Sequence, residues 1–158
     1  MIGILVGLML FAAGLVAVSA WRKAQRPVAD PAIAAAFLER NRSAPGVTQT
    51  ASGVQYQILN PGTGPRPTDS DTVRVTYVGT LTDGTVFDRS AAPVTFPVSG
   101  VVPGFSEALK LMSRGARYRV WIPPALGYGE RGAGPIPANA VLVFDIDLVG
   151  IGTEPRAR

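Results

Sequence analysis

Apolar and polar residues alternate along much of the chain after residue 53. Alternation with a period of two is typical of strands that bury one face. It predicts strands at residues 54–59, 72–79, 85–88, 94–98, 116–122 and 140–149. In the strand at 116–122, Tyr118, Val120 and Ile122 alternate with Arg117, Arg119 and Trp121. Residues 43–52 lack the pattern, and we interpret them as a polar connection.

Two segments have the signals of short helices. Asp30-Pro31 supplies an N-cap followed by proline at the first helical position, which predicts a helix over residues 31–41. A second helix, begun by Pro103-Gly104, is predicted from Phe105 to Met112, where apolar residues recur at helical spacing. We therefore expect an α+β fold, an antiparallel twisted β-sheet wrapped around one short α-helix. The expected units are residues 1–21, a linker at 22–53, a domain at 54–151 and a disordered tail at 152–158.

The first twenty residues contain no charged side chain and no proline. At about 1.5 Å per residue, a helix of this length spans the roughly 30 Å hydrocarbon core of a bilayer. Trp21, Arg22 and Lys23 follow, as is typical of a membrane interface. Residues 1–21 therefore predict a transmembrane anchor. A cleaved signal peptide is the alternative, because Val18-Ser19-Ala20 resembles a cleavage site.

The composition excludes several kinds of chemistry. The chain has neither histidine nor cysteine, which excludes serine-histidine and cysteine-histidine hydrolases. The aspartates do not follow the spacing of a calcium loop, so we expect neither a metal nor a cofactor. The net charge is +4, but its arginines are scattered and accompany no recognised nucleic-acid module. We therefore do not expect nucleic acid as a partner.

The remaining candidates for a functional site are a group of apolar and aromatic residues near turns. On periodicity alone we would interpret this group as ordinary core. The letters of Gly127-x-Gly129-x-x-Gly132 match a phosphate-binding pattern, but prolines precede them and no helix follows. We interpret that segment as a loop.

Four segments that follow one another along the chain change this interpretation. They are Val75-Thr76-Tyr77-Val78-Gly79-Thr80-Leu81 with Asp83-Gly84-Thr85 and Phe87-Asp88, Val101-Val102-Pro103-Gly104-Phe105, Pro123-Pro124 with Leu126-Gly127-Tyr128-Gly129, and Gly134-Pro135-Ile136-Pro137 with Phe144-Asp145-Ile146. Together they resemble the FKBP-type peptidyl-prolyl cis-trans isomerases, over about residues 54–151. Upstream, Phe37-Leu38-Glu39 and the run from Gly46 to Tyr56 resemble the lead-in of bacterial FKBPs of the cell envelope.

The resemblance implies an isomerase that acts on X-Pro bonds of folding envelope proteins, with proline-containing polypeptides as substrates. It implies substrate contacts from a set of apolar residues: Tyr77, Phe87, Phe96, Val101, Phe105, Ile136 and Phe144. It implies catalytic roles for the Val102 N–H and the Tyr128 hydroxyl, which would each hold a substrate carbonyl. It also implies a catalytic role for Asp88, as a polar, orienting group at the pocket wall, and a hydrogen-bonded turn carboxylate is an equally open alternative to that role.

The sequence departs from the family in three places. Phe105 stands where the family usually has tryptophan, which puts the binding of macrolide inhibitors in question. The loop from Asp88 to Val94 is short and has no clear arginine partner for Asp88. The flap position often held by histidine falls near Arg131-Gly132-Ala133. These departures leave open a catalytically weak, membrane-tethered chaperone or peptide-binding module of the same fold.

The side of the membrane is a second open question. Arg22, Lys23 and Arg26 follow the apolar segment, and the positive-inside rule would place the domain in the cytoplasm. The resemblance to envelope FKBPs implies the opposite side. We expect a single-pass protein of the bacterial inner membrane with its domain on the periplasmic face. Release into the periplasm after signal cleavage is the alternative.

Overall fold

The computed structural model describes residues 30–152. The expected anchor at residues 1–21 lies outside this range, as do residues 153–158 of the expected tail. Within residues 30–152, no helix has both the length and the apolar character needed to cross a membrane.

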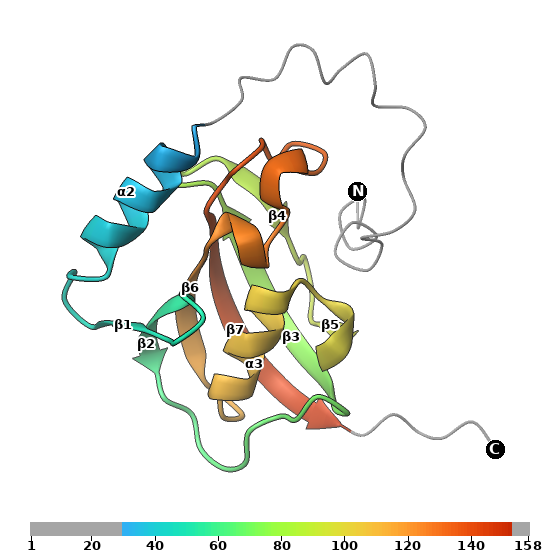
Figure 1. The fold of residues 1–158 in the computed structure, drawn as a ribbon. Coiled ribbons are helices and arrows are strands. Elements are labelled where there is room, and N and C mark those ends of the chain that lie inside the picture. The colour runs from blue at the N-terminus through green and yellow to red at the C-terminus, as the bar shows by residue number, and fades with distance from the viewer. Residues whose placement is uncertain (1–29, 153–158) are drawn as a thin grey trace.

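The described chain forms one antiparallel sheet (Figure 1). Its strands are β1 (Val47–Gln49), β2 (Gln55–Asn60), β3 (Thr72–Thr80), β4 (Val86–Arg89), β5 (Val94–Pro97), β6 (Arg117–Ile122) and β7 (Leu142–Gly152). Their order is β1-β2-β6-β7-β3-β4, and β5 also pairs with β3. The strand β3 therefore contacts β7 along its length and two shorter strands on its other side.

The helix α3 (Pro103–Leu111) packs against one face of the sheet, as Figure 1 shows in front of β7 and β3. Its residues Phe105, Ala108 and Leu109 are fully buried in the main core. Pro103 occupies its first turn, where a missing N–H costs nothing. Gly104 allows a close approach to β6, because a Cβ at this position would clash with the side chain of Ile122. The predicted helix over this region is confirmed.

The helix α2 (Pro31–Asn41) packs on the other face of the sheet. Successive side chains of a strand point to opposite faces, so Trp121 of β6 lies opposite the core residue Val120. Trp121 is buried with Ala34 of α2 and Val141 in a second small cluster. The Asp30 side chain caps the helix by accepting a hydrogen bond from the Ala32 N–H at 2.8 Å. Each face of the sheet therefore carries one helix.

A buried glutamine joins α2 to the sheet. The Gln55 side chain is fully buried, and its Nε2 donates to the Leu38 carbonyl at 2.7 Å and to Gln49 Oε1 at 3.0 Å. Its Oε1 accepts a hydrogen bond from Asn41 Nδ2 at 2.8 Å. The C-terminal end of α2 is thereby bonded to β2.

The structure departs from the expected elements in two places. The expected fold has one helix against the sheet, whereas both α2 and α3 pack on it. Residues 43–52, interpreted as a polar connection, contain β1, which pairs with β2 in a hairpin. The segment from Gly127 to Gly132, interpreted as a loop, contains the 3-10 turn η4 (Gly129–Arg131), and another 3-10 turn, η3 (Pro124–Leu126), precedes it. A further 3-10 turn, η2 (Val98–Gly100), precedes α3.

Candidate active site

Five aromatic rings meet between α3 and the sheet. The Phe105 ring lies nearly perpendicular to that of Phe144, with centroids 5.0 Å apart. Phe144 meets Phe87 in the same manner at 5.5 Å. The Tyr77 ring contacts Phe96, Phe105 and Phe144 at 6.0–6.1 Å. Edge-to-face pairs stabilise beyond area burial because the positive edge of one ring meets the negative face of another.

The register of β3 and β7 places two of these rings over a glycine. Gly79 of β3 lies opposite Phe144 of β7. A Cβ on Gly79 would lie 2.7 Å from the Phe87 ring and 2.8 Å from the Phe144 ring. Any side chain at this position would therefore displace one of the two rings.

A hydrogen bond connects the cluster to an acidic side chain. The Tyr77 hydroxyl donates to Asp88 Oδ2 at 2.7 Å. Burial, the hydrogen bond to Asp88 and the negative charge of Asp88 all raise the pKa of the Tyr77 phenol. Tyr77 therefore stays protonated and remains a donor. Within residues 30–152, Asp88 makes no ion pair, in agreement with the lack of a clear arginine partner in the sequence.

The turn into α3 supplies a second polar group. Val102 is the N-cap residue of α3, and its carbonyl accepts hydrogen bonds from Phe105 N–H and Ser106 N–H, both at 3.0 Å. In the described part of the chain, no group accepts a hydrogen bond from the Val102 N–H. Val101 and Val102 are both buried beside the rings. This N–H is therefore available to a carbonyl that enters the site.

The loop after β6 carries Tyr128 and Ile136. Tyr128 is partly buried and packs against the main core. Burial, and secondly the charge of Asp88, raise the pKa of Tyr128 to about 12. Ile136 is 1% exposed, and its backbone pairs with Ala133 in a short bridge. Nine of the ten predicted site residues thus lie in one core or pack against it, and the tenth, Asp88, is bonded to that core through the Tyr77 hydroxyl.

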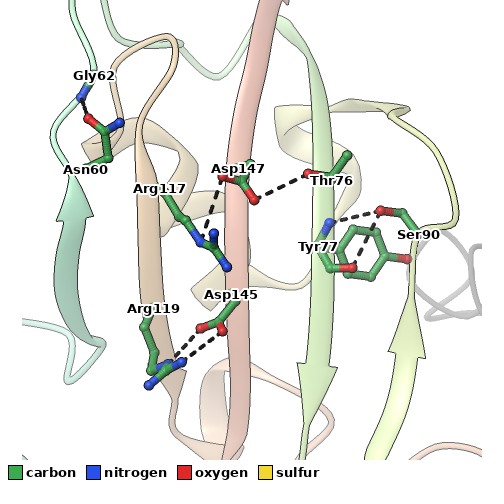
Figure 2. A network of polar contacts seen from close by, with 9 residues as sticks. All are labelled: Asn60, Gly62, Thr76, Tyr77, Ser90, Arg117, Arg119, Asp145 and Asp147. Atoms are coloured by element: carbon green, nitrogen blue, oxygen red, sulfur yellow. Dashed lines mark hydrogen bonds and ion pairs between the residues drawn. The ribbon is translucent and has the colours of Figure 1, made fainter.

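Sequence reasoning missed one residue beside this cluster. Ser90 follows β4 and bonds to the backbone of Tyr77 (Figure 2). Ser90 is half-buried, and a single serine after a strand has no sequence signal for such a contact.

A hollow of about 320 Å³ lies on the other face of the sheet. Its lining includes Phe37 of α2, Trp121 of β6 and the Arg119–Asp145 ion pair, which Figure 2 shows between β6 and β7. It includes none of the predicted site residues. The aromatic cluster and this hollow are therefore separate features.

Comparison with known proteins decides the family. The sequence model of the FKBP-type peptidyl-prolyl cis-trans isomerase matches residues 64–149. The chain belongs to the FKBP-type peptidyl-prolyl cis-trans isomerases. A second family model, of the domain amino-terminal to this FKBP-type isomerase, matches residues 16–58.

Among curated relatives of this FKBP, the FKBP-type isomerase FkpA of Aeromonas hydrophila is 50% identical over 118 residues, which are 73% of this chain and 44% of the relative. The outer membrane protein MIP of Legionella longbeachae is 49% identical over 120 residues, 73% of this chain and 52% of that protein. The 22 kDa FKBP-type isomerase of Escherichia coli is 50% identical over 119 residues, 73% of this chain and 58% of that protein. The chain thus spans about half the length of these relatives.

Solved structures of FKBPs share the fold. The crystal structure of FkpA from Escherichia coli matches with a TM-score of 0.76 at 40% identity, covering 78% of this chain and 60% of that one. A peptidyl-prolyl isomerase from Pseudomonas syringae matches with a TM-score of 0.75 at 36% identity, covering 88% of this chain and 99% of that one.

Proposed function

We propose that this chain accelerates cis–trans isomerisation of X-Pro bonds in polypeptides, through an apolar aromatic site without covalent or metal catalysis. The observation that carries the proposal is the buried cluster of perpendicular rings joined to Asp88 by the Tyr77 hydroxyl. Family membership supports the same activity.

The chemistry requires only shape and polarity. Rotation about an X-Pro bond crosses a barrier of about 20 kcal/mol because twisting breaks amide resonance. The twisted imide is less polar than the planar one. An apolar site therefore stabilises the twisted state relative to the ground state, and this difference lowers the barrier.

Each predicted residue has a place in this scheme. The prolyl ring would pack against the apolar group of Tyr77, Phe87, Phe96, Val101, Phe105, Ile136 and Phe144. The Val102 N–H would hold one substrate carbonyl. The Tyr128 hydroxyl, protonated because its pKa is about 12, would donate to another. Asp88 would orient the Tyr77 hydroxyl rather than exchange a proton.

A proline-peptide isomerisation assay tests the proposal. We expect the wild-type chain to show turnover. Phe87→Ala should lower kcat/KM by about tenfold or more, because ring contact is lost. Tyr128→Phe should lower kcat/KM by about fivefold, because one hydrogen bond is lost. Tyr118→Phe is the matched control, because Tyr118 bonds to the Leu111 carbonyl away from these rings. An inactive wild-type protein would overturn the proposal.

The second candidate function is a catalytically weak chaperone or peptide-binding module. Phe105, at 0% exposure, favours it because this position in FKBPs usually holds a larger indole. The same substitution bears on macrolide inhibitors, for which we expect weak affinity. This candidate would be supported if the wild-type protein retained unfolded polypeptides without accelerating isomerisation.

For location we propose the cell envelope. One relative is named an outer membrane protein, which supports an envelope protein over a cytoplasmic one. We further propose that residues 1–21 anchor the chain in the inner membrane with its domain in the periplasm, or that they are a cleaved signal. A C-terminal alkaline phosphatase fusion tests the side, since this enzyme becomes active only after export. An inactive but intact fusion would contradict the periplasmic proposal, and the mass of the mature chain separates an anchor from a cleaved signal.

A further inference from the structure

The strand β3 lacks a strand neighbour at Tyr77 on one side. There β5 pairs with residues 72–75 of β3, and β4 pairs with residues 78–80. A residue in an antiparallel ladder directs its N–H and its C=O toward the same neighbour. Both backbone groups of Tyr77 therefore face the interval between β4 and β5.

Ser90, the residue after β4, bonds to both backbone groups of Tyr77 in this interval. Its N–H donates to the Tyr77 carbonyl at 3.0 Å, as a strand residue would. Its Oγ accepts from the Tyr77 N–H at 2.9 Å, in the position that a backbone carbonyl would take. Figure 2 shows the Ser90 hydroxyl facing both backbone groups of Tyr77. The backbone N–H and the side-chain hydroxyl of Ser90 together thus replace a strand partner for one residue of the ladder.

The contact closes a ring of bonds around the site. Asp88 lies two residues before Ser90 and accepts the hydrogen bond of the Tyr77 hydroxyl. In the described part of the chain, this hydroxyl is the only hydrogen-bond partner of the Asp88 carboxylate. The orientation of the carboxylate therefore depends on Tyr77, and Ser90 holds the main chain of Tyr77.

We propose that Ser90 is a positioning residue of the active site, which acts by holding the Tyr77 backbone so that its phenol meets Asp88. The inference rests on the proposed isomerase function. It assigns Ser90 no contact with substrate. The proposed role differs from a purely structural one, because the effect of Ser90 on turnover must pass through the Tyr77–Asp88 bond.

Isomerase kinetics on the full chain separate these roles. We expect Ser90→Ala to lower kcat/KM by about fivefold, the size of one lost hydrogen bond. Ser90→Thr keeps the hydroxyl and should restore most of the loss. Ser70→Ala is the matched control, because Ser70 is an exposed serine whose hydroxyl bonds to Thr68 in the turn before β3. In a Tyr77→Phe background, Ser90→Ala should have less than about a twofold effect, since the bond it supports is already gone.

A measurement that does not use activity keeps this inference distinct from the proposed function. By NMR, the Tyr77 amide should be protected from hydrogen exchange in the wild-type protein and in Ser70→Ala, and unprotected in Ser90→Ala. The Tyr77 ring resonances should shift on Asp88→Asn in the wild-type protein and shift less when Ser90 is also alanine. If the wild-type chain is inactive, the proposed function fails and these spectra alone decide whether Ser90 positions Tyr77. Additive kinetic effects, or ring shifts unchanged by Ser90→Ala, would overturn the role of Ser90.

Discussion

The rings of Phe105 and Phe144 stand almost perpendicular, at 87°, with centroids 5.0 Å apart. Both side chains are completely buried, so the base of the cluster is filled by phenylalanine without a gap of solvent. The usual tryptophan at position 105 would have to enter a space that these rings already occupy.

We expect Phe105→Trp to destabilise the protein by about 1–3 kcal/mol, because extra ring atoms in a packed core force their neighbours apart. The same change should raise macrolide affinity, since it restores the larger ring and an N–H donor. Thermal unfolding and fluorescence titration with a macrolide measure the two effects. Phe105→Leu is the control that changes packing without adding a donor. Unchanged macrolide affinity in Phe105→Trp would show that the ring at position 105 does not limit binding.

The Tyr77–Asp88 bond should contribute both to stability and to turnover. We expect Tyr77→Phe to lower the free energy of unfolding by about 1–3 kcal/mol, because it leaves a carboxylate without its donor. It should also lower kcat/KM. Tyr118→Phe removes a longer bond of 3.3 Å to the Leu111 carbonyl and should lower stability by about 1 kcal/mol or less with unchanged turnover. Equal losses of turnover in both variants would contradict a role for the Tyr77 hydroxyl in the site.

Stability should decline at alkaline pH. Burial raises the pKa of Tyr128 to about 12 in the folded protein, and burial also raises the pKa of Tyr77 and of Tyr118. The folded state therefore holds these protons more tightly than the unfolded state, whose phenols titrate near pH 10. The resulting stabilisation is complete below about pH 10 and is lost as pH rises toward 12. Urea unfolding between about pH 8 and 11 measures it, and Tyr128→Phe should reduce the dependence. An identical dependence in that variant would refute this assignment.

Two ion pairs on the sheet face that carries α2 should differ in strength. Arg119 bonds Asp145 through Nε at 2.7 Å and Nη2 at 2.9 Å, whereas Arg117 lies 3.9 Å from Asp147. We expect Asp145→Asn to cost about 0.5–1 kcal/mol and Asp147→Asn less than about 0.5 kcal/mol, because bidentate geometry strengthens a half-exposed pair. Both variants should keep wild-type turnover, since Arg119 and Asp145 line the hollow rather than the aromatic site. Denaturation in low and in about 1 M salt tests the difference, which salt should reduce.

Local patterns predicted most strands, but not what covers them. The alternation of β6 placed Trp121 with Arg117 and Arg119, and the structure keeps it on that face. Trp121 is nevertheless buried, with only 8% of its surface exposed, because α2 packs over it. The strand β1 was not predicted, for a related reason. Its three residues include one apolar side chain, Val47, which packs against the cluster under α2. Long-range contacts of this kind leave no local period.

The site residues came from the resemblance, since periodicity alone favoured an ordinary core. Their convergence depends on the register that sets Gly79 opposite Phe144, and a sequence pattern does not specify register between distant strands. Ser90 and Gln55 were missed because each is a single polar residue whose partners lie elsewhere in the chain.

The bonds of Gln55 have a mechanical consequence. A pull on the chain at Asp30 would enter the domain along α2 and pass through Leu38 and Asn41 to Gln55. From Gln55 the load would reach β2 and then β6, while β3 lies on the far side of β7. The strands β6 and β7 therefore lie between the strand where tension from the N-terminal direction enters the sheet and the strand that carries Tyr77.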